Sequence, residues 1–529
     1  MIRIRQIKVP IENDTLQELR KKICQKVKCQ EKDIISVKIS KKSLDARFKP
    51  NIFYIYEVDI KVSNEENILK RNNNQDILKT PDETYKTPKK GNIKLNKSPI
   101  IVGSGPAGLF SAYLLASQGY NPIIIERGEP VDERVKTVEH FWTTGELKEN
   151  SNVQFGEGGA GTFSDGKLNT LVKDKDYRMK KVFEIFVESG ASPDILYTHN
   201  PHIGTDILRN VVKNMRNKII SLGGTFLYNT CLTNLIIENN QIKSIEINNK
   251  EIMDTDVIVL AIGHSARDTF LMLQQNNITL EPKPFAIGLR IQHPQELINT
   301  NQYGKNYNKN LPQSSYKLTY KTKEGRGVYS FCMCPGGYVV NASSENGRLA
   351  INGMSYNDRG SANANSAIVV TVTPDDYGNN PLDGMNYQRH LEELTYELGN
   401  GKIPTQLLKD FHNNVESTSL GNILPIFKGN YKLSNLNKLL PEYISLSLKE
   451  AFINFDNKIK GFNQYDAILA ALESRTSSPV RIPRNDNLES IDIKGLYPCG
   501  EGAGYAGGIT TSAMDGIKVA EAIITKYYN

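Results

Sequence analysis

The chain has 529 residues, which is too long for a single hydrophobic core, so two or three domains are expected. Its six cysteines are too few and too scattered for a disulfide framework, and no Cys/His group has zinc-ligand spacing, so we expect neither a disulfide scaffold nor a metal site. The net charge of +7 is uneven: residues 1–98 carry 23 Lys and Arg against 13 Asp and Glu, whereas the rest of the chain is slightly negative.

The first residues predict a small α+β module over residues 1–63. The pattern of apolar residues favours a strand at Ile2–Val9, a helix at Leu16–Val27, and strands at Ile34–Ile39 and Ile52–Val62. Residues 64–97 are polar, which predicts a linker. The N-terminus lacks the charged-then-apolar order of a secretory signal, and no apolar run is long enough to span a bilayer, so a cytoplasmic location without membrane contact is expected.

The positive charge of this N-terminal region has two interpretations. Either the basic residues form a solvated surface and linker, or they bind an acidic partner such as RNA. Aromatic residues are not interleaved with the basic ones, so nucleic-acid binding is the weaker of the two expectations.

A glycine turn follows the linker, in the order strand, turn, helix, strand and acid. Gly103, Gly105 and Gly108 come directly after the buried strand that ends at Val102, and Pro122–Ile125 forms a second strand before Glu126. This order predicts a dinucleotide site, in which Gly105 lets the backbone approach a pyrophosphate at the N-terminus of the helix. The carboxylate of Glu126 is expected to accept hydrogen bonds from the ribose. The remaining expected contacts of this turn are Pro106, Ala107 and Arg127.

Two further segments favour FAD over NAD. Residues 257–263 form a strand that ends at Gly263, like the second glycine-ended strand of FAD proteins with this fold. Near the C-terminus, Gly500 and Glu501 precede a glycine-rich run to Gly508, and a helix begins near Ile509. The run resembles the closing FAD motif, and the positive end of its helix would stabilise a reduced flavin.

The expected fold class is therefore α/β, with a Rossmann-like FAD-binding domain of glutathione-reductase type. We expect the first part of this domain at residues 98–284 and its closing part at 476–529. Between them we expect an inserted strand-rich substrate domain at 285–384 and a mainly helical segment at 385–475.

Across nearly its whole length the chain resembles the FAD-dependent dehydrogenase-like, or NAD(FAD)-utilizing dehydrogenase, family of bacterial proteins. The resemblance rests on eight segments, which are residues 42–47, 103–108, 155–168, 263–268, 331–337, 352–355, 473–480 and 500–511. The family name describes a class of flavoprotein and does not fix a substrate.

The wider superfamily implies additional flavin contacts. It implies that the backbone of Gly159, Ala160 and Gly161 approaches FAD, and that Ser164, Asp165 and Lys167 lie near its ring. It also implies that the backbone at Cys231 and Leu232 pairs with the adenine. As a side chain, Cys231 is expected to be a small buried hydrophobe.

Candidates for the chemistry are fewer. Cys332 and Cys334 are two residues apart in a predicted strand, so they share a face, and they form either a strained redox pair or two packed thiols. His264 and Arg267 follow the strand that ends at Gly263 and are candidates for helix capping, a phosphate contact or proton transfer. Arg475 is a candidate for binding an anionic substrate group or the flavin phosphates, or for a surface salt bridge, and Arg267 is a second candidate for substrate binding.

The sequence thus predicts a FAD-dependent oxidoreductase of unknown small-molecule substrate that transfers hydride at flavin N5. It has no second strand–glycine turn–helix unit, so NAD(P)H, if it is the reductant, is expected to bind only transiently. An RNA-associated flavoprotein and a flavin-binding scaffold or sensor are the alternatives. The oligomeric state is not predicted.

Overall fold

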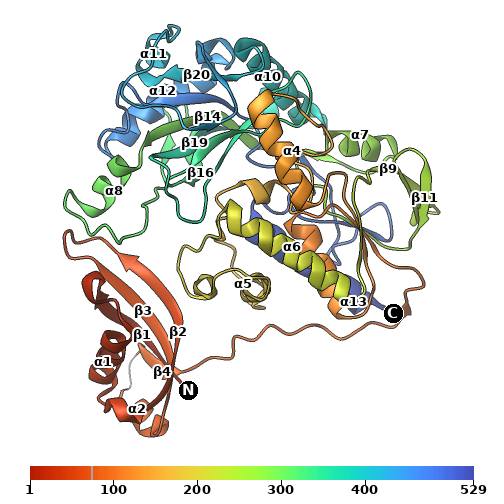
Figure 1. Ribbon diagram of the computed structural model, residues 1–529. Coiled ribbons are helices and arrows are strands. Elements are labelled where there is room, and N and C mark those ends of the chain that lie inside the picture. Colours follow the sequence, from red (N-terminus) through yellow and green to blue (C-terminus); the bar gives the residue numbers. More distant parts are fainter. Residues whose placement is uncertain (73–74) are drawn as a thin grey trace.

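The computed structural model describes residues 1–72 and 75–529, and it begins with a small α+β module at one end of the molecule (Figure 1). The module contains β1 (Ile2–Pro10), α1 (Leu16–Val27), β2 (Ile34–Asp45), β3 (Phe53–Val62), α2 (Glu65–Arg71) and β4 (Ile77–Lys79). Its strands form one antiparallel sheet in the order β2-β3-β1-β4. Thr15 caps α1 by accepting the N–H of Glu18. The helix buries Leu19, Ile23 and Val27 in the core that it shares with the sheet.

The structure corrects the predicted linker over residues 64–97, because α2 and β4 belong to the module. Ile68 and Ile77 are buried in the core of the module, and β4 pairs with β1. Residues 80–98 then run extended along the next domain, where β5 (Ile93–Lys94) pairs with β26 (Tyr527–Tyr528) (Figure 1). Within the predicted linker, Asn73 and Asn74 lie outside the described residues. The burial of Ile68 and Ile77 therefore anchors α2 and β4 to the module, although the surrounding sequence is polar.

The second domain is built on a five-stranded parallel sheet in the order β25-β12-β6-β7-β8. The strands are β6 (Ile100–Val102), β7 (Ile123–Ile125), β8 (Thr225–Leu227), β12 (Ile258–Leu260) and β25 (Leu496–Pro498). The helices are α3 (Pro106–Ser117), α4 (Val131–Thr144), α5 (Arg178–Glu188), α6 (Thr205–Ser221), α7 (Arg267–Gln275) and α13 (Ile509–Lys526). A small antiparallel sheet is formed by β9 (Leu232–Glu238), β10 (Gln241–Ile247) and β11 (Glu251–Asp254). We call this the nucleotide-binding domain. Helix α3 is packed between α6 and α13, and apolar residues accordingly occupy nearly all of its sides.

The third domain has a seven-stranded mixed sheet in the order β15-β16-β19-β14-β23-β20-β22. The strands are β14 (Phe285–Pro294), β15 (Thr319–Lys321), β16 (Gly327–Cys334), β19 (Asn363–Val372), β20 (Ile403–Leu407), β22 (Tyr431–Leu433) and β23 (Ile468–Glu473). The helices are α8 (Gln295–Tyr303), α9 (Pro374–Tyr377), α10 (Asp383–Gly399), α11 (Leu408–Asn413) and α12 (Glu442–Asp456). A second sheet contains β17 (Tyr338–Asn341), β18 (Ile351–Met354) and β21 (Phe427–Lys428), and β13 (Glu281–Pro282) pairs with β24 (Val480–Arg481). We call this the sheet domain.

The sheet domain unites two segments that were predicted separately. Residues 285–384 are strand-rich, and residues 385–475 contain more helix than strand. The second segment is not separate from the first, because β20, β22 and β23 join the same sheet. All the residues of β20 and β23 are buried. Short strands that are buried on both faces show no alternation of polar and apolar residues, so their pattern cannot be told from that of a buried helix.

The nucleotide-binding domain contacts both the N-terminal module and the sheet domain (Figure 1). The sheet domain lies on one side of it. Strand β2 of the N-terminal module makes backbone hydrogen bonds to the loop at residues 197–199, where the N–H of Lys42 donates to the carbonyl of Tyr197. Among the described residues, no helix combines the length and the apolar character needed to cross a bilayer.

Candidate functional site

A cavity of about 820 Å³ opens at the carboxyl ends of the parallel strands. Its wall contains Val102 and Gly103 at the end of β6, Ala261 after β12, Glu126 after β7 and Cys499 after β25. The crevice outside the carboxyl ends of such strands is where α/β folds bind ligands. Residues of the sheet domain close the other side, and the volume is in the range of cofactor and small-molecule sites.

The first glycine turn is as tight as its pattern predicts. Gly103 has a φ of +97°, and a Cβ atom there would lie 2.4 Å from the carbonyl oxygen of Ala261. Gly108 does not line the cavity; a Cβ on it would lie 1.9 Å from the carbonyl oxygen of Gly103, so it is needed for packing. Gly105 faces the cavity with Pro106 and has no atom closer than 3.8 Å to such a Cβ. The N-terminus of α3 is therefore open to an anion.

Glu126 lies in the cavity wall, but the chain itself occupies its carboxylate. Oε2 accepts the N–H and the hydroxyl of Ser104 at 2.9 and 2.8 Å, and Oε1 accepts the N–H groups of Gly128 and Gly156 at 2.9 and 3.0 Å. A carboxylate has about four such positions. A ribose hydroxyl would have to replace one of these donors, so Glu126 first of all holds the turn and the neighbouring loop together.

The second glycine segment joins the first turn to the last helix. Gly159, Ala160 and Gly161 all line the cavity. A Cβ on Gly159 would lie 3.0 Å from the Cα of Gly105, and one on Gly161 would lie 3.0 Å from Cγ1 of Ile509. The predicted cofactor segments from three parts of the sequence thus meet in one place.

A buried arginine that sequence reasoning missed shapes this segment. The guanidinium of Arg134 donates to five carbonyl oxygens between residues 152 and 159 at 2.7 to 3.1 Å. Burial lowers the pKa of Arg134 to about 10, although nearby acids oppose this shift. No local motif marks the residue, because its acceptors are backbone atoms some 20 positions along the chain.

The closing segment contributes to the wall of the same cavity. Gly507, Gly508 and Ile509 line the wall, and no atom lies within 4 Å of a Cβ placed on Gly508, so the start of α13 is open to a ligand. Glu501 also lines the wall, and its Oε1 is 3.3 Å from Nδ1 of His264. Gly500 does not reach the cavity, because it packs against Ala107.

The predicted adenine side contains Arg127, Cys231 and Leu232 together. Nη2 of Arg127 donates to Sγ of Cys231 at 3.0 Å, its guanidinium pairs with Asp268, and it lies over the ring of Phe155 at 4.4 Å. Desolvation raises the pKa of the Cys231 thiol, and the residue is half-buried in the cavity wall.

The structure places some of the predicted catalytic residues at the cavity and others away from it. Gly263 and His264 line the cavity, and Nε2 of His264 has no hydrogen-bond partner among the described residues. Cys332 also lines it, but Cys334 does not. The two cysteines are free thiols on different sides of the strand, because the register of β16 shifts after Phe331 and Cys332 takes a φ of 45°. The expectation that they share a face is therefore wrong.

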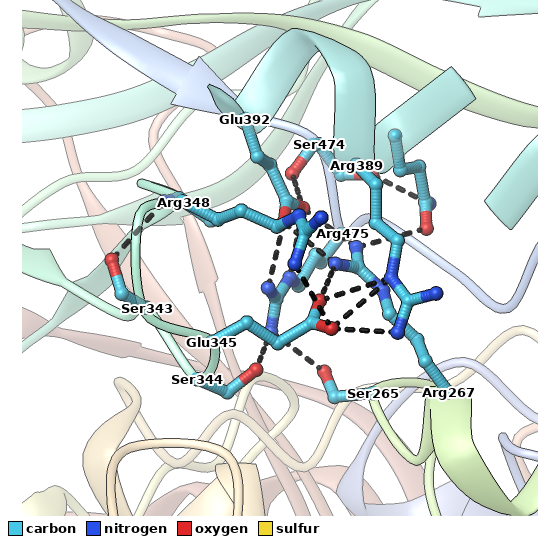
Figure 2. A network of polar contacts seen from close by, with 12 residues as sticks. Ser265, Arg267, Ser343, Ser344, Glu345, Arg348, Arg389, Glu392, Ser474 and Arg475 are labelled. Atoms are coloured by element: carbon cyan, nitrogen blue, oxygen red, sulfur yellow. Dashed lines mark hydrogen bonds and ion pairs between the residues drawn. The ribbon is translucent and has the colours of Figure 1, made fainter. Parts of the chain in front are cut away.

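Arg267 is a second correction, because it lies inside a buried network rather than at the cavity (Figure 2). Its Nη1 and Nη2 donate to Glu392 at 2.8 Å each, and it also pairs with Glu345. Arg475 binds the other side of Glu392 and does line the cavity, where its Nη1 donates to the hydroxyl of Ser344 at 2.6 Å. Charge compensation by distant acids is invisible in a local motif.

The sheet domain adds residues to the wall that sequence reasoning did not select. These are Lys317, Phe331, Asn352 and Thr476. Lys167 and Asp165, which the resemblance implies near the ring, are also in the wall. Lys317, Phe331, Asn352 and Thr476 reach the wall because the chain between residues 285 and 476 folds back onto the glycine turn.

The residues present fit a large dinucleotide such as FAD. The cavity wall has two glycines with open space around them, Gly105 and Gly508, and both lie at helix N-termini. Two buried nitrogen atoms of residues in its wall, Nε2 of His264 and Nζ of Lys167, have no hydrogen-bond partner among the described residues.

Family models match three parts of the chain. Residues 284–476 match the model described as "FAD-dependent protein, C-terminal domain-like", and residues 101–147 match an NAD(P)-binding Rossmann-like domain. Residues 1–61 match a domain of unknown function.

Similar proteins include one relative along the whole length. An uncharacterized protein of Clostridium beijerinckii is 49% identical over 531 residues, covering 99% of both chains. Among solved structures, glycine oxidase from Geobacillus kaustophilus is 9% identical with a TM-score of 0.33, covering 82% of this chain and 96% of that one. L-proline dehydrogenase from P. horikoshii is 14% identical with a TM-score of 0.34, covering 82% and 94%. These two scores are too low to carry an argument.

Proposed function

Because the chain belongs to a family of FAD-dependent proteins, we propose that it is an oxidoreductase whose FAD lies in the cavity between the nucleotide-binding domain and the sheet domain. The cofactor is FAD. The observation that carries the proposal is that the first glycine turn, the second glycine segment and the start of α13 line one cavity together with residues of the sheet domain.

The two helix N-termini have separate roles in this proposal. The free N–H groups at the start of α3, beside Gly105, bind the pyrophosphate. The start of α13, beside Gly508, faces the flavin and stabilises negative charge on it. These positions, and the strand order with β25 next to β12, support our proposal that the domain is of the glutathione-reductase type.

The sheet domain holds the substrate and keeps water from it. FAD, when bound, accepts or donates a hydride at its N5 atom. The chain's own contribution is to orient a small organic substrate against the wall formed by the sheet domain, in a cavity enclosed by two domains. Since the sequence has only one dinucleotide-binding turn, we propose that NAD(P)H, where it serves as reductant, binds only transiently.

Anaerobic stopped-flow reduction of the purified protein tests the proposal. The protein should be yellow, should be bleached by dithionite, and should be reduced by NADH, NADPH or an organic substrate on a time scale of turnover. A flavin that dithionite bleaches but that no organic donor reduces would instead favour a scaffold or sensor. A colourless protein that takes up no added FAD would refute the proposal.

A further inference from the structure

One part of the cavity wall lies outside the N-termini of α3 and α13, the two helix ends that we assign to FAD. It consists of Lys317, Phe331, Cys332 and Asn352 from the sheet domain, together with Lys167 from the loop after the second glycine segment. This wall brings two ammonium groups, a thiol, an amide and an aromatic ring to one side of the cavity. We call it the lysine wall.

The ammonium group of Lys167 is only partly compensated. It makes no hydrogen bond to the described residues, and its ion-pair partner is Asp165, whose Oδ2 lies 3.4 Å from Nζ. The carboxylate of Asp165 is already bound by Arg359, whose Nε and Nη2 donate at 3.1 and 2.6 Å, and by the hydroxyl of Ser355. Two cations thus share one carboxylate, which leaves a net positive charge in the wall.

The titratable groups around Lys167 do not remove this charge. Although the Cys332 thiol faces the cavity, the surrounding protein raises its pKa to about 12 and Lys167 opposes this, so the thiol is neutral near pH 7. His202 also faces Asp165, and burial lowers the pKa of this imidazole, so it is neutral at the same pH. Lys317 is exposed in the wall and adds a second positive charge.

The wall continues into an apolar rim beside Lys167. Leu171 and Val172 line the cavity, yet they are 88% and 47% exposed. Covering such side chains with an apolar ligand removes them from water and is favourable. Phe331 presents an aromatic ring from the sheet domain to the same cavity.

We propose that the lysine wall and its rim form the substrate subsite, and that the substrate is a small carboxylate with an apolar chain. The inference rests on the proposed function, because it assigns the two glycine openings to FAD. A carboxylate supplies the single negative charge and the acceptor that the ammonium of Lys167 lacks. A phosphate monoester would bring nearly two negative charges, more than the buried ammonium of Lys167 balances, because water screens the charge of the exposed Lys317.

Calorimetric titration of the protein as purified tests the subsite at constant ionic strength. The probes are acetate, butanoate, hexanoate, hexanamide and hexyl phosphate. Hexanoate should bind at least about tenfold more tightly than hexanamide, because it gains a charge-assisted hydrogen bond. From acetate to hexanoate, affinity should rise by about two- to fourfold for each methylene group. Hexyl phosphate should bind more weakly than hexanoate.

Variants assign the effect to the residues. Lys167→Met should weaken hexanoate at least about tenfold and leave hexanamide unchanged, while Lys167→Arg keeps most of the affinity. Lys173→Met is the matched control in the same loop, since Lys173 is exposed and does not line the cavity. Leu171→Ser should reduce the gain per methylene group without affecting acetate.

Three results would overturn the proposal. They are equal binding of hexanoate and hexanamide, tighter binding of hexyl phosphate than of hexanoate, and unchanged hexanoate affinity in Lys167→Met. Because heat of binding is measured without turnover, failure of the subsite can be told apart from failure of the proposed function. A chain that binds hexanoate as described but whose flavin no organic donor reduces would keep the subsite and refute the oxidoreductase.

Discussion

Glu392→Gln should destabilise the protein strongly, because Glu392 is the centre of the buried network (Figure 2). Its carboxylate is fully buried and accepts five hydrogen bonds at 2.7 to 3.0 Å, two from Arg267, two from Arg475 and one from the hydroxyl of Ser474. Glutamine would remove the charge and turn an N–H₂ group towards the two guanidinium groups, which have only donors. Arg475 would then lose its carboxylate partner, and Arg267 would keep only that of Glu345.

The magnitude follows from the burial of the pair. Removing one partner of a buried, hydrogen-bonded ion pair costs about 3 to 5 kcal/mol. For a domain the size of residues 284–476, this corresponds to a fall in melting temperature of about 6 to 20 °C. Because Arg475 lines the cavity, the variant should also retain less FAD on gel filtration.

Thermal unfolding followed by circular dichroism measures the effect, with Glu393→Gln as the matched control. Glu393 is the next residue of α10 and pairs with the partly exposed Arg348, so its loss should cost less than about 1 kcal/mol. Arg267→Met added to Glu392→Gln should restore part of the stability, because one unpaired guanidinium is removed. Equal melting temperatures for Glu392→Gln and Glu393→Gln would refute the reasoning.

The same network predicts a dependence on pH. Burial alone would raise the pKa of Glu392, but Arg267 and Arg475 outweigh it and hold the pKa well below its ordinary value. A depressed folded-state pKa stabilises the protein above the unfolded value of about 4.3, and this contribution is lost as the pH falls through the folded value. The difference in stability between the wild type and Glu392→Gln should therefore be constant near neutrality and narrow in acid.

Three further outcomes are expected. Gly103→Ala should yield protein without FAD, because the new Cβ would lie 2.4 Å from the carbonyl oxygen of Ala261. The control Gly347→Ala, at a φ of +72° but in open space, should lower the free energy of unfolding by about 1 kcal/mol and keep FAD. Absorbance at 450 nm measures the bound FAD of both variants. Arg134→Met should lose at least about 3 kcal/mol in urea unfolding, together with FAD, since it strips five buried carbonyls of their donor. Iodoacetamide should label Cys332 slowly at pH 8, because its pKa is raised to about 12, and rapid labelling with a midpoint near 8.5 would contradict this.

The sequence was most informative where the chemistry is local. The strand, glycine turn and helix around Gly103, Gly105 and Gly108 lie within a few residues of one another. Close backbone contacts explain Gly103 and Gly108, and Gly105 leaves the cavity wall open. The choice of FAD over NAD rested on the strand that ends at Gly263 and on the closing segment around Glu501 and Gly508, and the family match confirms FAD.

The sequence was least informative where long-range packing decides. Ile68 and Ile77 draw α2 and β4 into the N-terminal module despite their polar surroundings. A bulge at Cys332 separates two thiols whose spacing suggested a shared face. Arg267 is placed by Glu392, which is 125 positions away in the chain and on a different domain.

A crystal structure of the purified yellow protein tests the central claim most directly. We predict one FAD per chain, with its pyrophosphate beside Gly105 at the start of α3 and its ring near Gly508 at the start of α13. Density for the cofactor outside this cavity, or a cavity that stays empty in protein supplied with FAD, would contradict the account.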